Sequence, residues 1–252
     1  MKRRVENLTA SAKKDCLERV FNIICTGKLF KRQCMDFTWS FSSLKDYVNC
    51  PKQYQEVKIL KRFYKKPTKE MTYGNEVHKA LEHYVADGTP LLENYKRFQP
   101  VLDSLVEIDG EKHPERRMAL NRDGEACSYG ADDRWVRGIV DLLIVDGDKA
   151  FIVDYKTGSN KYPDPKQLKL MALMTFAHFP EVNHIKAGLL FVIHNSFLDE
   201  EYKREQIKDL WGAFHGDLER MKVSYENDAW MPNPTPLCGW CPVHTCQFHK
   251  ER

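Results

Sequence analysis

The segment over residues 138–158 constrains this chain more than any other part of its sequence. Two apolar runs flank an Asp-Gly-Asp sequence, and a two-residue turn at Gly147-Asp148 is a strong signal for a β-hairpin. A hairpin centred on that turn places Asp141 directly opposite Asp154. Directly opposed residues have Cβ atoms roughly 5 Å apart. The sequence therefore predicts a pair of close carboxylates.

A third polar residue joins this pair, because Lys156 lies two positions beyond Asp154 and points to the same face. The strands are otherwise apolar, so two like charges would repel each other and lose hydration there. A divalent cation removes both penalties, and oxygen ligands favour Mg²⁺ or Mn²⁺. The alternatives are a hairpin at the sheet edge with both acids in solvent, or a longer, bulged turn that shifts the register.

The rest of the chain predicts helices, a sheet, a crossover helix, another strand and a last helix, the order of a mixed α/β domain. Helices are expected over residues 11–24, 42–54 with a cap at Ser42 or Ser43 and a break at Pro51, 71–86 ending at Gly88, 96–108, from an Asp164-Pro165 cap to about Phe179, and 200–222. Strands are expected over residues 116–120, 135–145, 150–156 and 187–194.

Composition narrows the class of protein. The chain has 252 residues, of which 42% are apolar, enough for one large domain with a sizeable core. Its 39 Lys and Arg against 36 Asp and Glu are too balanced to predict a polyanionic partner. No run of about 18 apolar residues predicts a membrane span. The basic N-terminus lacks the apolar stretch of a secretory signal, which favours a cytosolic location.

The eight cysteines are unevenly distributed, and in a cytosolic chain they are not expected to form disulfides. Scattered cysteines of this kind are usually small core residues; they are Cys16, Cys25, Cys34 and Cys127. The C-terminal tail crowds three more into nine residues, at Cys238, Cys241 and Cys246. Three neighbouring thiolates suggest a metal site that needs a fourth ligand.

The hairpin resembles the signature of the PD-(D/E)XK nuclease superfamily. That signature is an Asp, a turn, then Asp or Glu, any residue and Lys, often followed by Thr-Gly. Asp141, Asp154 and Lys156 match it and are followed by Thr157 and Gly158. Among the branches, the chain is most similar to the RecB-like one, which contains CRISPR-associated exonucleases and many phage exonucleases.

Three further motifs of that branch occur in the same order here. They are a Gly-x-x-x-His at Gly74 and His78, a downstream Gln at Gln167, and a Ser-rich helix that runs into Cys-Pro over residues 40–51. The branch commonly has Tyr four residues after the Gln, where this chain has Met171. The matches span about residues 40–249, and their order and spacing make the set specific although each motif alone is weak.

The resemblance implies an α/β, restriction-endonuclease-like core, in which helices flank a mixed central sheet, with an N-terminal helical region and a Cys-rich C-terminal tail. The expected parts are an N-terminal extension without assigned role, a helical region with the Cys-Pro and Gly-x-x-x-His motifs, the nuclease core and the tail. Their expected bounds are residues 1–36, 37–110, 111–229 and 230–252. The extension is hypothesised to be dispensable.

The resemblance also implies a metal-dependent DNA exonuclease. His78, Asp141, Asp154 and the Tyr155 carbonyl would hold Mg²⁺ or Mn²⁺. Lys156 would orient the attacking water or stabilise charge on the phosphate oxygens. Gln167 would position the water or the substrate strand. Glu115 is a candidate for an extra carboxylate near the site.

In the resembled branch an early cysteine joins three late ones around a [4Fe–4S] cluster. Cys50 matches the early position, and Cys238, Cys241 and Cys246 match the late ones. Two alternatives stay open: a structural Zn²⁺ completed by His244 or His249, and free thiols.

A basic stretch over residues 52–69 is the expected nucleic-acid contact, because cations can bind phosphates and aromatic rings can stack on bases. Its candidate residues are Lys58, Lys61, Arg62, Tyr64, Lys65 and Lys66. The alternative is a solvated basic helix whose apolar side is buried.

Three functions are open at this point: an exonuclease that prefers free ends or single strands, a structure-specific endonuclease, and a non-catalytic module for DNA binding or assembly. The non-catalytic module is disfavoured because the chain keeps Asp141, Asp154 and Lys156 intact. The chain has no P-loop, so unwinding would need a helicase or recombination partner. Phage recombination, repair and DNA degradation are the candidate pathways, in the cytoplasm of a bacterium or of a phage-infected host.

Overall fold

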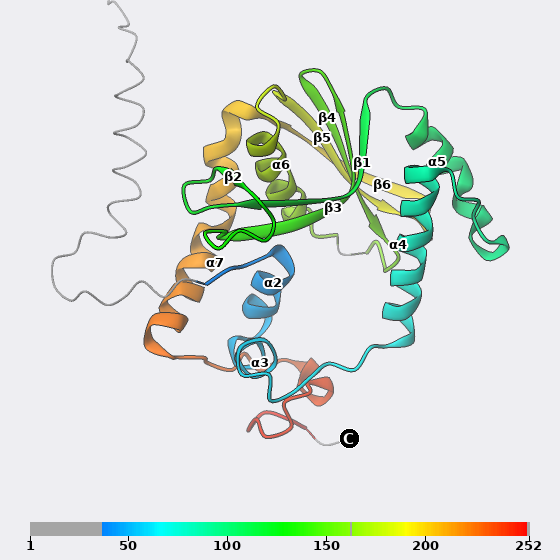
Figure 1. Cartoon of the computed structure of the whole chain (residues 1–252). Coiled ribbons are helices and arrows are strands. Elements are labelled where there is room, and N and C mark those ends of the chain that lie inside the picture. Colours follow the sequence, from blue (N-terminus) through cyan, green and yellow to red (C-terminus); the bar gives the residue numbers. More distant parts are fainter. Residues whose placement is uncertain (1–36, 162, 251–252) are drawn as a thin grey trace, which may run out of the picture. The chain divides into compact units, whose positions relative to one another are not determined.

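The computed structural model describes residues 37–161 and 163–250. A six-stranded mixed sheet, of order β2-β1-β3-β4-β5-β6, forms its centre and helices flank it (Figure 1). The strands are β1 Glu111–Leu120, β2 Ala126–Cys127, β3 Val136–Asp146, β4 Lys149–Lys156, β5 His184–Phe191 and β6 Ser196–Lys203. The expected N-terminal extension, with its helix over residues 11–24, lies outside the described residues.

Helices precede, interrupt and follow the sheet. They are α2 Phe41–Asn49, α3 Pro51–Tyr54, the π-helix η1 Gln55–Ile59, α4 Lys69–Asp87, the 3₁₀ helix η2 Glu93–Phe98, α5 Gln99–Val106, α6 Lys166–His178, the 3₁₀ helix η3 Arg204–Gln206, α7 Ile207–Asn227 and the 3₁₀ helix η4 Pro236–Trp240. None of the described helices is long and apolar enough to cross a bilayer.

The predicted hairpin and its register are confirmed. β3 and β4 pair from Asp146↔Lys149 to Leu142↔Val153 around a two-residue turn. Gly147 takes the left-handed conformation, with φ +56°, that such a turn requires. β4 then pairs in parallel with β5, because α6 carries the chain across the sheet between them.

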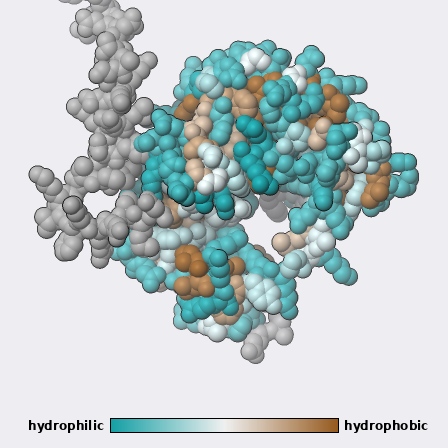
Figure 2. All heavy atoms as spheres, in the orientation of Figure 1, coloured by the Kyte–Doolittle hydropathy of each residue, from teal (hydrophilic) through white to brown (hydrophobic). Residues whose placement is uncertain are grey.

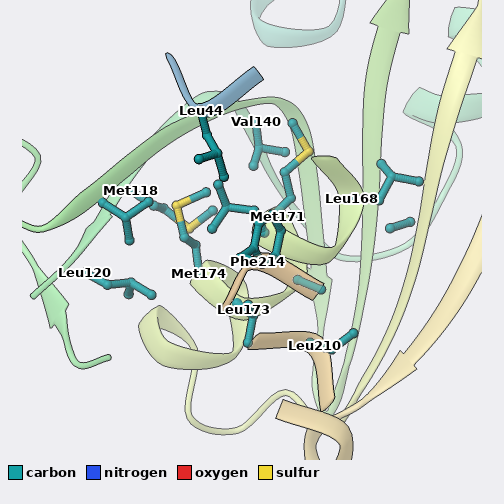
Figure 3. Close-up of a cluster of buried hydrophobic side chains, with 14 of the residues drawn as sticks. Leu44, Met118, Leu120, Val140, Leu168, Met171, Leu173, Met174, Leu210 and Phe214 are labelled. Carbon is teal, nitrogen blue, oxygen red and sulfur yellow. The ribbon is translucent and has the colours of Figure 1, made fainter. Parts of the chain in front are cut away.

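Two apolar clusters fill the two sides of the sheet. On one side α6 and α7 cover it, and Figure 3 shows Met171, Leu173 and Met174 of α6 packed with Phe214 of α7 and Val140 of β3. The other cluster joins α4 and α5 to β3, β4 and β5. Met171, which occupies the position where the resembled branch commonly has Tyr, is a core residue here.

The helix expected over residues 200–222 is wrong at its start. Residues 196–203 form the edge strand β6, which pairs antiparallel with β5, and α7 begins only at Ile207. The charged sequence of this segment resembles a helix surface, but the open edge of β5 supplies hydrogen-bond partners and Tyr202 is buried. Tertiary pairing therefore overrides local preference.

Other expected bounds shift by a few residues. Ser40 caps α2 in place of Ser42 or Ser43: its hydroxyl accepts from the Ser43 N–H at 3.2 Å, and the Ser43 hydroxyl accepts from the Ser40 N–H at 2.8 Å. β1 begins earlier than expected, at Glu111, because it pairs with the whole length of β3. The expected cap at Asp164 lies one residue too early, since Pro165 is the N-cap of α6.

Candidate active site

β3 is irregular at Asp141, where the alternation of its side chains reverses. Val140 packs on the α6 side and Leu142 on the α4 side, although residues two apart on a regular strand share a face. The β3–β4 ladder ends at Leu142↔Val153, so Asp141 and Asp154 are the next opposed pair. Here the Tyr155 N–H donates to Asp141 Oδ2 at 2.7 Å. The carboxylate thus replaces a backbone partner.

β1 carries a matching irregularity at Glu115. The pairs Pro114↔Leu142 and Arg116↔Val140 place Glu115 opposite Asp141. Glu115 has φ +48°, a conformation that is strained for a residue other than glycine and that concentrates at functional sites.

Glu115 also has an acidic neighbour that sequence reasoning missed. Burial raises the pKa of Glu115, and the charge of Glu82 on α4 raises it further. Glu82 lies one helical turn after His78, and this spacing was the available signal.

Asp154, Lys156 and Gln167 form one polar group on the α6 side of the sheet. Asp154 is 3% exposed and its Oδ2 contacts the Lys156 ammonium. The Gln167 side chain joins both: its Nε2 donates to Asp154 Oδ1 at 2.8 Å, and its Oε1 accepts from Lys156 Nζ at 3.1 Å. The crossover helix α6 therefore fixes the two charged side chains of β4.

α4 brings His78 to the other side of Asp141. A Cβ on Gly74 would lie 2.9 Å from Thr157 Oγ1, so the glycine lets the helix approach the end of β4. One turn later, His78 Nδ1 lies 3.5 Å from Asp141 Oδ2. The Gly-x-x-x-His spacing is explained by this close approach.

The electrostatics of the site suit a divalent cation. Burial raises the pKa of Asp141 well above its ordinary value, and the charge of Asp154 raises it further. Burial also raises the pKa of Asp154, against the opposing effect of Lys156. Burial lowers the pKa of His78, which keeps the imidazole neutral and able to bind a metal. A cation among these groups would favour the charged carboxylates.

As they stand, the described side chains contain no preassembled cluster of three or more His, Cys, Asp or Glu ligands. An ion would therefore have to draw the donors of the site together. We name His78, Asp141, Asp154, Lys156 and Gln167 the carboxylate centre.

Comparison with known families decides the assignment. The family described as the PD-(D/E)XK nuclease superfamily matches residues 38–122 and 93–246. The chain belongs to this superfamily. Its mixed sheet flanked by helices is the restriction-endonuclease-like fold that the sequence predicts.

Solved structures also resemble this nuclease-superfamily chain. A protein from Eubacterium rectale, named as a candidate exonuclease, is 13% identical, with 98% of this chain and 97% of that chain covered and a TM-score of 0.49. The protein SSO0001 is 13% identical, with 96% of each chain covered and a TM-score of 0.39. No curated protein matches the chain.

A second candidate centre of this superfamily member is a pocket lined by four cysteines from both ends of the described chain. Cys50 caps α3, and Cys238, Cys241 and Cys246 come from the tail; all four are unpaired thiols. We name these four residues the cysteine pocket.

Four N–H groups point at sulfur atoms of the cysteine pocket. Gln53 donates from its backbone to Cys50 at 3.4 Å and from its side chain to Cys241 at 3.1 Å. The Asn233 N–H donates to Cys50 at 3.5 Å, and the Thr235 N–H to Cys238 at 3.3 Å. Donors of this kind commonly surround the sulfur ligands of bound metals.

The two histidines weighed as zinc ligands differ in position. His249 lines the cysteine pocket, and its buried Nδ1 has no hydrogen-bond partner among the described residues. His244 does not line the pocket, and its ring packs against Phe63 with centroids 4.9 Å apart. Of the two, His249 therefore fits a Cys₃His site.

The basic stretch predicted to contact DNA is partly neutralised by carboxylates. Lys58 and Lys65 lie 3.4 and 3.0 Å from Asp46, and Arg62 lies 2.8 Å from the buried Glu56. Lys61, Tyr64 and Lys66 are exposed. The sequence predicted phosphate contacts for three of these side chains but did not predict that they pair with carboxylates around η1; they are Lys58, Arg62 and Lys65.

Proposed function

We propose that this chain is a Mg²⁺- or Mn²⁺-dependent DNA exonuclease of the RecB-like type, which hydrolyses phosphodiester bonds. The observation that carries the proposal is the carboxylate centre itself. The buried Asp154, the partly buried Asp141, a lysine and a histidine meet where the β3–β4 ladder ends. A fold serving only to bind DNA gains nothing from acids whose burial disfavours their charge.

Asp141, Asp154, His78 and the Tyr155 carbonyl would hold the metal. A bound Mg²⁺ or Mn²⁺ lowers the pKa of a bound water and shields the charge of the phosphate. The Tyr155 N–H fixes the Asp141 carboxylate in place. The residues present therefore fit a cation of this class.

Lys156 supplies the positive charge next to the reacting phosphate. Its ammonium would orient the attacking water or stabilise the negative charge that develops on the phosphate oxygens. Gln167 holds Lys156 and Asp154 through one amide, so it is a positioning residue in this geometry. A water or a substrate strand at Gln167 would complete its hydrogen bonding.

Exonuclease action is supported by the motif order of the RecB-like branch and not by a feature of the fold. Linear single strands or duplexes with free ends are the proposed substrates, with a helicase or recombination partner supplying unwound DNA. The proposed setting is repair, recombination or DNA degradation in a bacterial or phage-infected cytoplasm. An endonuclease with the same centre is the second candidate.

A cleavage assay tests both the site and the mode. Two substrates are used, end-labelled linear single-stranded DNA and circular single-stranded DNA. Each is incubated with Mn²⁺ and one of three proteins: the wild-type chain, Asp154→Ala or Asp148→Ala. We expect wild type and Asp148→Ala, an exposed control on the same hairpin, to degrade only the linear strand. We expect Asp154→Ala to lose at least about a hundredfold in rate. Cleavage of the circle would establish the endonuclease, and an active Asp154→Ala would remove the proposed site.

For the cysteine pocket we propose a structural [4Fe–4S] cluster, with a Cys₃His zinc site through His249 as the alternative. Four thiolates are the usual ligands of such a cluster, and the N–H donors around the sulfurs support a thiolate site. Purification without oxygen, an absorption spectrum and iron and zinc analysis separate the cases. Absence of both metals would leave free thiols.

We also propose that the parts of the chain keep separate roles: residues 1–36 as a dispensable extension, 37–110 as a helical region, 111–229 as the nuclease core and 230–252 as the tail. Deleting residues 1–34 should leave cleavage unchanged. Loss of folding in that deletion would contradict the first of these assignments.

A further inference from the structure

The sheet face beyond the carboxylate centre carries an exposed cluster of arginines around one tyrosine. The guanidinium carbons of Arg117 on β1 and Arg137 on β3 lie 5.8 and 5.5 Å from the centre of the Tyr129 ring. Both arginines are exposed and Tyr129 is half-buried. We name these three residues the arginine platform. Figure 2 shows that one face of the molecule is mostly hydrophilic, with smaller hydrophobic areas.

The arginine platform lies on the same face of the sheet as Glu115. Met118, Leu120, Val136 and Val140 point into the core on the α6 side. Arg117 and Arg137 alternate with them and therefore point to the opposite side. The charge of Arg117 lowers the pKa of Glu115, opposing its burial, so the two side chains are electrostatic neighbours.

The platform continues the carboxylate centre along the strands. Arg137 precedes Asp141 by four residues of β3, a distance of about 13 Å at the rise of a strand. At a rise of about 3.4 Å per nucleotide, this distance spans about four stacked nucleotides. Asp154, Lys156 and Gln167 lie on the other side of the sheet, so a strand that crosses the platform would meet the centre at Asp141, beside His78 and Glu115.

Neither Arg117 nor Arg137 forms an ion pair, within 4.0 Å, with a carboxylate of the described residues. The predicted DNA-contact residues Lys58, Arg62 and Lys65 all do. Guanidinium groups held over an aromatic ring are preorganised to bind phosphate through paired N–H donors. A polyanion is thus the complementary occupant of this face.

We propose that Arg117 and Arg137, held by Tyr129, bind the phosphate backbone of single-stranded DNA about four nucleotides from the scissile bond. This inference rests on the proposed function, because it assigns the platform to the same substrate. The platform contacts the strand outside the reacting group, so it sets affinity and not the chemical step.

Binding is measured in EDTA, where no cleavage occurs, by the fluorescence anisotropy of a labelled single-stranded oligonucleotide at several salt concentrations. We expect Arg117→Ala/Arg137→Ala to bind about tenfold more weakly. Its slope of log affinity against log salt should fall by about 1.4, or about 0.7 for each lost phosphate contact. Arg117→Lys/Arg137→Lys should keep the slope.

Lys149→Ala/Lys208→Ala is the matched control, since it removes two exposed charges elsewhere, at the hairpin tip and on α7. It should change neither affinity nor slope. A double arginine variant that melts lower but binds with wild-type slope would show a purely structural role and overturn the platform.

Cleavage with Mn²⁺ is measured in parallel. A wild type that binds through the arginines but does not cleave would contradict the proposed function alone. A wild type that cleaves, beside an arginine variant with unchanged affinity, would contradict the platform alone.

Discussion

The carboxylate centre and the cysteine pocket both gather metal-binding side chains, but different parts of the fold build them. The residues of the carboxylate centre come from regular elements: β3, β4, α4 and α6. The cysteine pocket joins the N-cap of α3 to an irregular tail whose main regular element is the short η4. The core of the fold positions the carboxylate centre, whereas the cysteine pocket brings the start of α3 next to the C-terminal tail.

This difference suggests that the carboxylate centre serves a reaction and that the cysteine pocket serves stability. At the carboxylate centre the fold keeps Asp141 and Asp154 where burial opposes their charge, an arrangement that costs stability and prepares a reaction site. At the cysteine pocket apolar packing supports only part of the tail, since Trp230 and Val243 are buried but Met231, Leu237 and Trp240 are largely exposed. An occupant of the pocket would supply the missing stability.

The largest expected effect is on catalysis. Lys156→Ala should lower the cleavage rate about a thousandfold if the lysine stabilises charge in the transition state, and it should also lower the melting temperature because the buried Asp154 loses its cationic partner. Lys149→Ala, on the same strand but exposed at the turn, is the control. Rates of labelled-strand cleavage and thermal melts are compared. A fully active Lys156→Ala would contradict the assignment of the chemistry to the carboxylate centre.

A smaller effect is expected at His78. His78→Ala should weaken Mn²⁺ binding about 10–100-fold, so that high Mn²⁺ restores much of the cleavage. Titration of activity with Mn²⁺ measures this shift. His83→Ala, one helical turn away from the site and paired with Asp87, should behave like wild type. A loss that no Mn²⁺ concentration restores would give His78 a role other than metal binding.

The cysteine pocket should respond in stability. Cys241→Ser removes a sulfur atom that accepts from Gln53, and we expect the metal-loaded protein to melt about 5–10 °C lower, the equivalent of a few kcal/mol. Cys127→Ser on β2 should melt like wild type. Cleavage by the folded fraction of Cys241→Ser should persist. An unchanged melting temperature with abolished cleavage would place the pocket in the chemistry instead.

The smallest effect has the opposite sign. Because the pKa of Asp141 is raised on folding, its ionisation disfavours the folded state above that raised pKa, and the penalty disappears toward low pH. Asp141→Asn keeps an oxygen for the Tyr155 N–H without the charge. We expect it to melt about 2–4 °C higher than wild type at pH 8 in EDTA, with the gain shrinking as the pH falls. A lower melting temperature at pH 8 would mean that the carboxylate stabilises the fold.

The sequence predicted the features that local geometry determines. A two-residue turn leaves one register for the hairpin, so the facing pairs from Asp146↔Lys149 to Leu142↔Val153 followed from residue numbers alone, and Asp141 and Asp154 come directly after the last of them. The position of His78 followed from the motif resemblance, and the contact of Gly74 with Thr157 gives its physical reason.

Features that depend on distant pairing were not predictable. β6 looks like the start of a helix until the free edge of β5 is known. The reversal at Asp141 needs the strained Glu115 on another strand. The arginine platform depends on how the loop between β2 and β3 places Tyr129, which no local pattern encodes.

The cysteine pocket also cannot form until all four of its cysteines have been translated. Cys50 emerges from the ribosome 188 to 196 residues before Cys238 and Cys246, the first and last of its three companions. At translation rates of about 5–20 residues per second, the α3 helix waits on the order of ten to forty seconds before the pocket can close. Throughout that interval a nascent chain exposes the Cys50 thiol without its three companions, so an occupant of the whole pocket could be delivered only after all four cysteines have emerged.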